Sequence, residues 1–424
     1  MTLRASSYLA SVLAAILGLA HADDWPQFRG PQRDGVSRET NLLKSWPEGG
    51  PTRLWLSTNL GAGYSSPAIV GERLYILGQR NGAQWLLCLD AKSGKERWAT
   101  RLGTAYTNEF GDGPRGTPTV TGGRVFGIGA NGEVVCAGAD NGREHWRTNL
   151  IDLGGKVPGW GYSESPLVDG SCAVCTPGGE HGAVVALDTK TGRLLWQSKQ
   201  FTDEAQYTSL MLLEKSGVRQ YISGNREHVV GLAATDGRLL WQQDFRSSVV
   251  VSQSPIVSGD QIYMVAAGGT GCKAVRLTEL DAVEVVYANK VMKNLPGGVV
   301  LFAGHIYGYS ESIGWVCQNW LTGNEVWSSK ALEKGCLTIA DGMIYCVTED
   351  HGAVALAEAS PSGWKEHSRF VLAPQSERRA VKGQVWTPPV IAHGRLYLRD
   401  QEKVWCFDIA VPSKRPGDRG KPRS

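Results

Sequence analysis

The sequence predicts an all-β fold, an eight-bladed β-propeller built of four-stranded antiparallel blades. The composition indicates a β protein rich in turns, because the 424 residues include 53 glycines and 15 tryptophans but only 8 phenylalanines. Two short patterns alternate along the chain and return about every 37 to 50 residues, which is typical of a repeat architecture. The chain also begins with half of a repeat and ends without the matching half, which indicates that the repeats close into a ring.

The first pattern ends in Gly-x3-Trp and describes two strands, which form one half of a blade. Its fullest copy runs from Ala186 to Trp196 and consists of a strand, a turn and a second strand. The aspartate of this turn can hydrogen-bond its own backbone, and the glycine supplies the positive φ that closes it. The structural tryptophans of this pattern are Trp55, Trp98, Trp146, Trp196, Trp241 and Trp327, with Tyr287 and Trp364 expected at the same place in the two remaining copies.

The second pattern describes the other half of a blade, again a strand, a short turn and a second strand. It opens with Ser/Thr-Pro and places an aromatic residue eight positions after the proline, as in Ser66-Pro67 followed by Tyr75. Trp55 precedes every copy of this pattern, and nothing after Phe407 supplies a final tryptophan strand. The simplest account is that the N-terminal strand around Trp55 completes the last blade, which leaves few free strand edges. A seven-bladed ring is the nearest alternative, and an open solenoid would need capping repeats.

The segments outside the repeats define the predicted domain organisation. Residues 1–22 have the features of a secretory signal peptide, with Arg4, an apolar stretch and an Ala-x-Ala cleavage site that ends at Ala22. We expect a strap over residues 23–51, the propeller over 52–410 and a disordered basic tail over 411–424. Cleavage near Ala22 would give a periplasmic or secreted protein.

Composition and charge exclude several classes of function. The hydrophobic fraction of 42% excludes a disordered chain. The sequence has no second long apolar run after the leader, which excludes a protein with several membrane spans. The net charge of +3 is accounted for by the leader and the tail, so the folded body does not have the basic face that nucleic-acid binding requires. We expect a monomer that does not bind nucleic acid.

The repeat resembles a known family. The segment Ala186-Leu187-Asp188-x-x-Thr191-Gly192-x3-Trp196 is similar to the tryptophan-docking repeat of PQQ-type propellers, which include the quinoprotein alcohol dehydrogenases and the BamB propeller of outer-membrane β-barrel assembly. The opening Asp24–Pro31 resembles a group of exported bacterial PQQ-binding-like propellers. The resemblance covers residues 24–409 and implies the fold more strongly than an activity, because function depends on sites grafted onto a fold.

The candidate binding residues lie on the face that carries the long connections between blades. These connections vary in length and run from each tryptophan strand to the next Ser/Thr-Pro, and such loops on a rigid scaffold commonly carry function. We expect a site there, off-centre towards the second to fourth blades, with an arginine for an acidic group and a tryptophan or tyrosine as the stacking surface. The alternative is an ordinary loop face whose aromatic residues only pack the loops. The candidate residues are Glu109, Arg115, Trp160, Tyr162, Glu164, Glu180, His181, Arg226 and Trp386.

The nine cysteines are predicted to be structural thiols, not ligands or disulfides. Cys172 and Cys175 lie on one predicted strand, where side chains at i and i+3 point to opposite faces, so no zinc site is expected. Cys88, Cys136 and Cys317 recur at one position of the repeat, which indicates a slot for a small buried residue. No metal site and no catalytic triad are predicted.

The expected function is that of an exported, non-catalytic binding or scaffold module. Its ligand would be a peptide, a glycan or an envelope protein held on the loop face, and no cofactor is expected. The alternative is a PQQ-dependent alcohol or sugar dehydrogenase. The resemblance implies, for that class, PQQ beside a disulfide of adjacent cysteines and a calcium ion held by carboxylate and amide oxygens, and this sequence has no adjacent cysteines.

Overall fold

A computed structural model describes residues 24–412 of the chain. The predicted signal peptide and all but the first two residues of the predicted basic tail lie outside the described residues. Within residues 24–412, no helix is long and apolar enough to cross a membrane.

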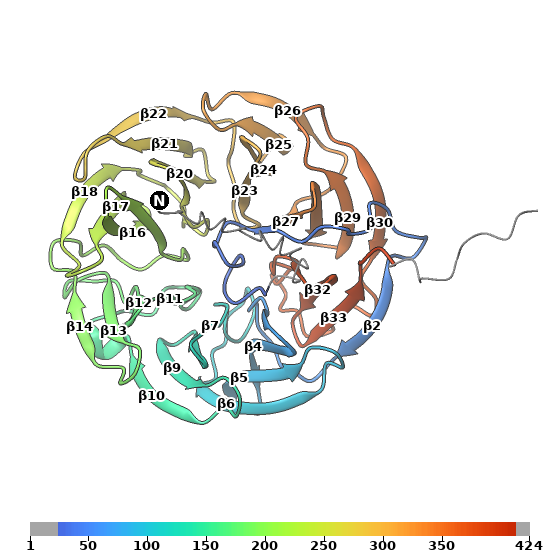
Figure 1. Cartoon of the computed structure of the whole chain (residues 1–424), viewed down its shortest axis with the longest axis horizontal. Helices are drawn as coiled ribbons and strands as arrows, with labels where there is room; N and C mark the ends of the chain where they lie inside the picture. The colour runs from blue at the N-terminus through green and yellow to red at the C-terminus, as the bar shows by residue number, and fades with distance from the viewer. Residues whose placement is uncertain (1–23, 413–424) are drawn as a thin grey trace, which may run out of the picture.

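Eight antiparallel sheets stand around a central axis, as predicted (Figure 1). From the axis outwards, the first four blades are β3 (Ala68–Val70), β4 (Arg73–Arg80), β5 (Ala83–Asp90) and β6 (Glu96–Thr104); β7 (Thr119–Thr121), β8 (Arg124–Ile128), β9 (Glu133–Gly138) and β10 (Glu144–Asn149); β11 (Leu167–Asp169), β12 (Cys172–Cys175), β13 (Val185–Asp188) and β14 (Leu194–Gln197); and β15 (Met211–Lys215), β16 (Val218–Gly224), β17 (His228–Ala233) and β18 (Leu239–Asp244). One short 3-10 helix, Ile151–Leu153, follows β10.

The other four blades follow the same order. They are β19 (Ile256–Ser258), β20 (Gln261–Ala266), β21 (Gly271–Leu277) and β22 (Val283–Asn289); β23 (Val299–Phe302), β24 (His305–Ser310), β25 (Gly314–Asn319) and β26 (Glu325–Ser329); β27 (Gly335–Ala340), β28 (Met343–Thr348), β29 (Ala353–Glu358) and β30 (Glu366–Val371); and β31 (Val390–Ala392), β32 (Arg395–Asp400), β33 (Lys403–Asp408) and β2 (Thr52–Ser57). A short strand β1 (Val36–Ser37) adds to the inner edge of the seventh blade by parallel pairing with β27.

The Asp/Thr/Gly turn and the tryptophan lock neighbouring blades together. In the third blade, Asp188 Oδ1 accepts hydrogen bonds from the backbone N–H groups of Lys190 (3.0 Å) and Thr191 (2.8 Å). Gly192 follows at φ +71°, and a Cβ there would lie 2.6 Å from the indole of Trp146 in the second blade. The turn therefore needs glycine both for its backbone conformation and for room, because the neighbouring tryptophan rests on it.

The last blade is closed by the N-terminal strand, as predicted. Strand β2 pairs antiparallel with β33 and places Trp55 opposite Cys406. The Trp55 ring lies 6.0 Å from that of Tyr397, and its indole N–H donates to the Ala91 carbonyl of the first blade (3.0 Å). The two ends of the propeller are thus joined by the same kind of tryptophan contact that Trp98 makes between the first and second blades.

The seventh blade departs from the predicted pattern. Strand β30 begins at Glu366, and Ser368 occupies the register position that the tryptophan takes elsewhere, so the assignment of Trp364 to this strand is wrong. The turn after β29 holds Trp364 ahead of the strand, where it packs against Trp315 (5.6 Å). Trp46, which precedes β2, packs between Tyr345 (6.0 Å) and Phe370 (5.5 Å) and fills the space instead.

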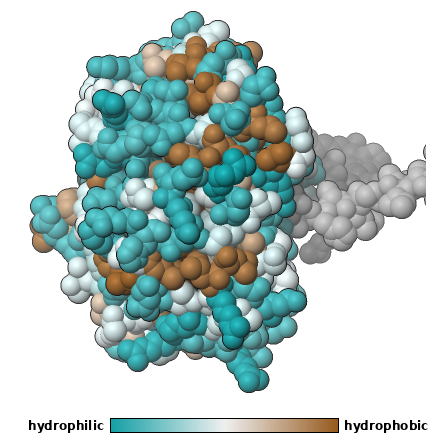
Figure 2. Space-filling model, turned by 90° about the vertical axis from the view of Figure 1, so that its left-hand side faces the viewer, coloured by the Kyte–Doolittle hydropathy of each residue, from teal (hydrophilic) through white to brown (hydrophobic). Residues whose placement is uncertain are grey.

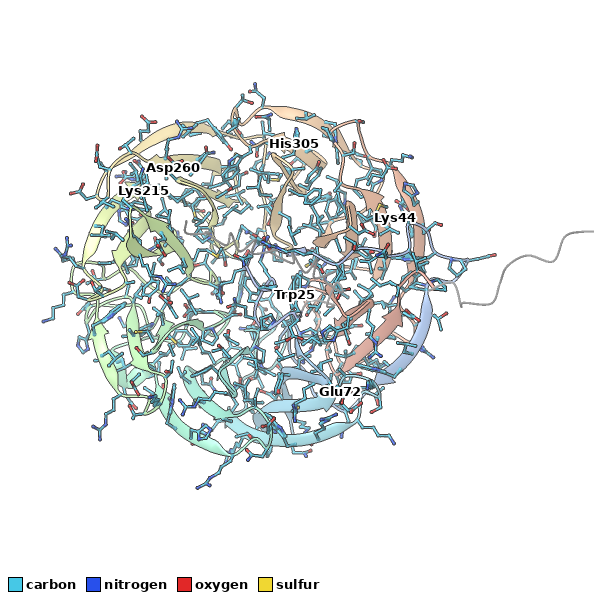
Figure 3. All side chains as sticks on the ribbon, in the orientation of Figure 1. Trp25, Lys44, Glu72, Lys215, Asp260 and His305 are labelled. Carbon is cyan, nitrogen blue, oxygen red and sulfur yellow. The ribbon has the colours of Figure 1, made fainter. Side chains whose placement is uncertain are left out.

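The segment before β2 crosses the central opening, and we call residues 24–50 the strap. Figure 1 shows it running from the rim into the centre, and Figure 3 places Trp25 near the middle of the ring. Trp25 bridges to Ile69 on the innermost strand of the first blade, and Arg33 donates to the carbonyls of Ser165 (3.0 Å) and Pro166 (3.3 Å) in the third blade. The backbone N–H of Gly71, in a short turn, donates to Asp24. The strap therefore lies across the channel towards the short-turn face.

The outer wall of the ring is mainly polar. Figure 2 views the molecule from the side that carries β14 and β18 in Figure 1, where hydrophilic residues are interrupted by apolar patches. Among the exposed apolar residues are Leu194 and Leu195 of β14. The outermost strands thus bury one face only, which agrees with their alternating sequence.

All nine cysteines are unpaired, as predicted. Cys88 and Cys136 stand directly opposite Trp98 and Trp146, in the small-residue slot of the repeat. Burial raises the pKa of the Cys136 thiol to about 12. The slot therefore holds the thiol as a small apolar group and keeps it protonated.

We expect denatured protein to titrate close to nine free thiols. A reductant should leave the melting temperature unchanged, because no disulfide constrains the chain. Thiol titration in denaturant and calorimetry with and without reductant measure the two quantities. A titre well below nine, or a melting temperature that falls with reductant, would contradict the small-residue slot.

Candidate functional site

A cavity of about 360 Å³ lies on the propeller axis above the strap. All eight connections between blades contribute to its wall, and Phe28 and Arg29 of the strap form part of its lining. Because the strap crosses the channel towards the opposite face, the cavity is a cup that opens towards the long connections. The volume is within the range of small-ligand pockets, about 300–1,000 Å³.

The residue two positions before the Ser/Thr of each repeat faces the cup. We call these eight equivalent positions the inner ring, since each blade supplies one member. One tryptophan, two tyrosines, two cationic residues and three small residues occupy these positions. The members are Tyr64, Arg115, Ser163, Tyr207, Ser252, Pro296, Lys334 and Trp386, and all of them line the cavity.

Aromatic side chains make up much of the wall. The Trp160 ring lies between those of Phe110 (5.2 Å) and Tyr207 (5.0 Å). On the other side, Trp386 lies 5.3 Å from Tyr64. These rings are only partly buried, so they present apolar surface to the cup.

The Arg115 guanidinium is largely occupied by contacts within the wall of the cup. Its guanidinium lies over the rings of Tyr106 (4.8 Å) and Tyr64 (5.7 Å) and donates to the carbonyls of Gly111 (2.7 Å) and Gly113. Burial lowers the pKa of Arg115. Replacing it would therefore disturb its own connection as well as the cup.

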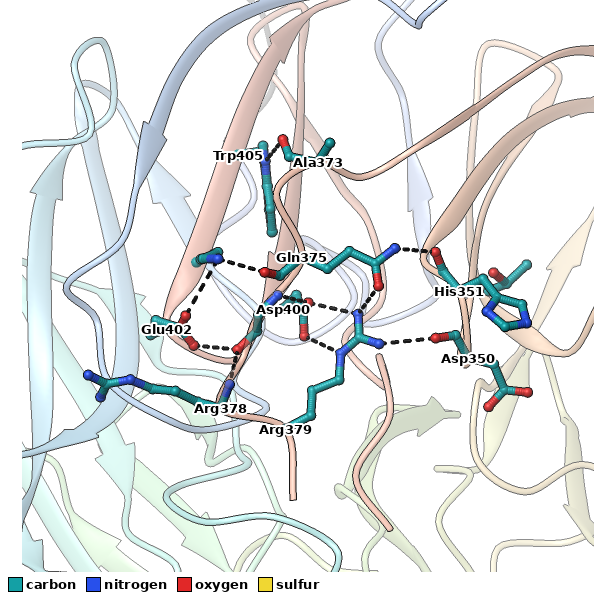
Figure 4. A network of polar contacts seen from close by, with 12 residues as sticks. Asp350, His351, Ala373, Gln375, Arg378, Arg379, Asp400, Glu402 and Trp405 are labelled. Atoms are coloured by element: carbon teal, nitrogen blue, oxygen red, sulfur yellow. Dashed lines mark hydrogen bonds and ion pairs between the residues drawn. The ribbon is translucent and has the colours of Figure 1, made fainter. Parts of the chain in front are cut away.

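The connection between β30 and β31 is anchored at its base and reaches across the rim. Figure 4 shows the anchor, in which Arg379 donates to both oxygens of buried Asp400 (2.9 and 2.8 Å). At the far end of the connection, Lys382 pairs with Glu109 (2.7 Å) and lies over the Phe110 ring (5.2 Å). The loop thereby spans from the eighth blade to the connection between the first two and places Trp386 in the wall.

The cationic residues of the cup have identifiable partners. Lys334 pairs with the buried carboxylate of Glu349 at 3.3 Å while its own side chain is 30% exposed. Burial raises the pKa of Glu349 to about 7. Arg29 donates to Gln253 (3.3 Å) and to the carbonyl of Val299, so it fastens the strap to the fifth and sixth blades.

The structure brings together only part of the predicted site. Arg115, Trp160 and Trp386 line the cup, and Glu109 lies at its rim. Tyr162 and Glu164 are 1% and 2% exposed, so neither presents the ligand surface expected of it. Glu180, His181 and Arg226 are exposed and do not line the cup, which is on the axis and not displaced towards the second to fourth blades.

Glu164 is a buried carboxylate within the wall. Its two oxygens accept hydrogen bonds from the backbone N–H (2.7 Å) and the hydroxyl (2.9 Å) of Thr176. Burial outweighs these bonds and the charge of Arg33 and raises the pKa of Glu164 to about 7. The folded protein therefore holds a proton here that the unfolded chain releases at a lower pH.

We expect Glu164→Gln to stabilise the protein at pH 8 by about 2–3 kcal/mol and to have no such effect below pH 4. Between the unfolded pKa near 4.5 and the folded pKa near 7, the native state binds more protons, so the stability of the parent falls as pH rises. Glutamine is uncharged and can accept from the Thr176 backbone N–H through Oε1 while its Nε2 donates to the Thr176 hydroxyl. Urea denaturation at pH 4, 6 and 8 gives the difference, with Glu109→Gln at the exposed rim as the control. A gain that is independent of pH would contradict the assignment.

The fold and the cup define a PQQ-like β-propeller with a blind central cavity. The chain belongs to the family described as outer membrane protein assembly factor BamB, whose model matches residues 46–126 and 83–276, together more than half of the chain. A curated relative, BamB of Burkholderia pseudomallei (strain K96243), is 24% identical over 253 residues, which are 50% of this chain and 64% of the relative. The match thus spans less than two thirds of that relative's length.

Two solved structures show the same fold at low sequence identity. BamB from Moraxella catarrhalis has a TM-score of 0.61 at 15% identity, over 85% of this chain and 100% of that one. Quinohemoprotein alcohol dehydrogenase from Comamonas testosteroni has a TM-score of 0.63 at 11% identity, over 94% of this chain and 82% of that one. At these identities the likeness is one of fold alone.

The sequence does contain a signal for the cup. The inner ring is defined by its offset from the Ser/Thr of each repeat, so aligning the eight copies would have selected Tyr64, Tyr207, Ser252 and Lys334. Phe28 and Arg29 have no such signal, because the strap is outside the repeats.

Proposed function

We propose that the protein is an exported, non-catalytic binding scaffold of the cell envelope that holds a partner protein on its long-connection face. The observation that carries the proposal is the convergence of all eight connections on one walled cup that is closed below by the strap. The name of the matched family, an outer membrane protein assembly factor, supports a protein partner and an envelope location. The predicted signal peptide supports export.

The residues of the cup do not fit the calcium ion that accompanies PQQ in the dehydrogenases. Calcium needs six to eight oxygen ligands, several of them carboxylates. The lining contains one carboxylate, Glu311, and the described residues contain no group of three or more His, Cys, Asp or Glu side chains placed to hold a metal ion. The lining instead carries three cations, Arg29, Arg115 and Lys334, which would oppose a divalent ion. We therefore derive no oxidoreductase chemistry for this site.

Photo-crosslinking in the exporting cell tests the proposal. Val381, at the tip of the β30–β31 connection, is fully exposed, and Leu321, in a short turn on the opposite face, is 64% exposed. A photoreactive amino acid at position 381 should give an adduct with a separate envelope polypeptide, while the same residue at position 321 should not.

Two results would overturn the proposal. Adducts that form equally from both positions would show that no face is selected. Alcohol-dependent dye reduction by purified protein supplied with PQQ and calcium would replace the scaffold by the dehydrogenase alternative.

A further inference from the structure

The strap closes the cup at its base, so a polypeptide chain cannot pass through the propeller along its axis. Phe28 and Arg29 line it from the strap side, and Arg29 is 9% exposed and bonded to two blades. A partner on the long-connection face can thus place a side chain in the cup but cannot pass a chain along the axis. The volume of about 360 Å³ has room for one large side chain and part of its backbone.

The aromatic wall of the cup favours an aromatic side chain. Six partly exposed aromatic rings line the cup, those of Phe28, Tyr64, Phe110, Trp160, Tyr207 and Trp386. Aromatic pairs prefer tilted or offset contacts with centroids about 4.5–7 Å apart, and the wall rings already pack in this manner. An inserted aromatic ring would continue the same packing and remove apolar surface from water.

The charges of the lining favour acidic residues next to the inserted side chain in the partner. Arg29, Arg115 and Lys334 stand against one lining carboxylate, Glu311. The Lys334 ammonium has three donors, is 30% exposed and meets Glu349 at 3.3 Å. A lysine or arginine anchor would face three like charges in the lining, whereas acidic residues beside an aromatic anchor would face one, that of Glu311.

We propose that the cup binds a segment of the partner protein that inserts one aromatic side chain flanked by acidic residues. The inference rests on the proposed scaffold function and names the chemistry of its partner. Buried aromatic anchors in desolvated pockets carry much of the affinity of protein interfaces, and a rim of weaker contacts excludes water around them.

Binding of short peptides by the purified protein tests this chemistry. The probes are blocked, dye-labelled peptides of sequence Gly-Glu-Phe-Glu-Gly, Gly-Glu-Ala-Glu-Gly and Gly-Lys-Phe-Lys-Gly, measured by fluorescence anisotropy. The first should bind at least tenfold more tightly than the other two. Added salt should weaken its binding, because part of the attraction is between exposed charges.

A substitution that fills the cup provides the second test. Leu295 lines the cavity, so Leu295→Trp should block it without removing a packing contact from a blade. Leu321→Trp makes the same change on the opposite face and is the matched control. We expect the first variant to lose binding of the acidic phenylalanine peptide and the second to retain it, with both melting within a few degrees of the parent.

Each of several outcomes overturns the inference. These are equal binding of the phenylalanine and alanine peptides, tighter binding of the lysine peptide, unchanged binding by Leu295→Trp, or no peptide binding at millimolar concentration. Free phenylacetate that competes as strongly as the peptide would assign the cup to a small aromatic acid instead. Adducts at position 381 that persist in Leu295→Trp would leave the scaffold function standing while this inference fails.

Discussion

Replacing Trp55 by alanine is expected to lower the free energy of unfolding by about 3–5 kcal/mol, because the change removes a large buried side chain at the seam of the ring. The indole is 8% exposed, packs on Tyr397 and donates to Ala91 of the first blade. Its loss leaves a cavity between the first and last blades and removes one of the two donors to the Ala91 carbonyl, the other being Arg395. Urea denaturation of the purified variant measures the difference.

Trp98→Ala is the matched control for this seam. Trp98 makes the equivalent contacts between the first and second blades, with Tyr75 (6.0 Å) and the Ala139 carbonyl (3.2 Å), and its blades are consecutive in the chain. In a closed ring the two variants should lose similar stability. If Trp55→Ala melts like the parent while Trp98→Ala does not, the ring is open at the N-terminal strand.

Replacing Arg399 by methionine is expected to cost about 3–5 kcal/mol, which is the usual scale for breaking a buried charged network. The side chain is 1% exposed on β32 of the last blade. Its guanidinium donates to the first-blade carbonyls of Ser65 (2.8 Å) and Leu77 (2.7 Å) and to Gly61 (3.3 Å). Methionine fills similar space without a donor, so buried carbonyls on the far side of the seam lose their partner.

Two further variants separate the hydrogen bonds from the packing. Arg399→Lys keeps a charge but not the planar fork, so its unfolding free energy should fall between those of the parent and Arg399→Met. Arg395→Met, on the same strand, removes a partly buried guanidinium that bonds one first-blade carbonyl, that of Ala91, and should cost about 1 kcal/mol. Equal losses for the Arg395 and Arg399 methionine variants would contradict the role of Arg399 at the seam.

The sequence predicted some residues of the candidate site correctly, but it did not show which side chains of the connections are buried. Trp160 and Trp386 were predicted from loop composition, and both line the cup. Glu164 was predicted by the same reasoning, yet it is buried against Thr176, while the preceding residue, Ser163, lines the cup. Loop composition does not distinguish these cases, since both side chains precede the same Ser/Thr-Pro signal.

The sequence by itself determined the strand pairs, the number of blades and the closure of the ring. These follow from local rules: each turn requires its Asp and Gly, and each docking tryptophan requires a small residue opposite it. The unpaired strands at the two ends of the propeller can only pair with each other, which closes the ring. Only the tertiary structure decided that the strap closes one end of the channel, that Trp46 replaces a blade tryptophan in the seventh blade, and that the cavity lies on the axis. Those features arise where segments far apart in the chain meet, and no spacing within a repeat encodes such contacts.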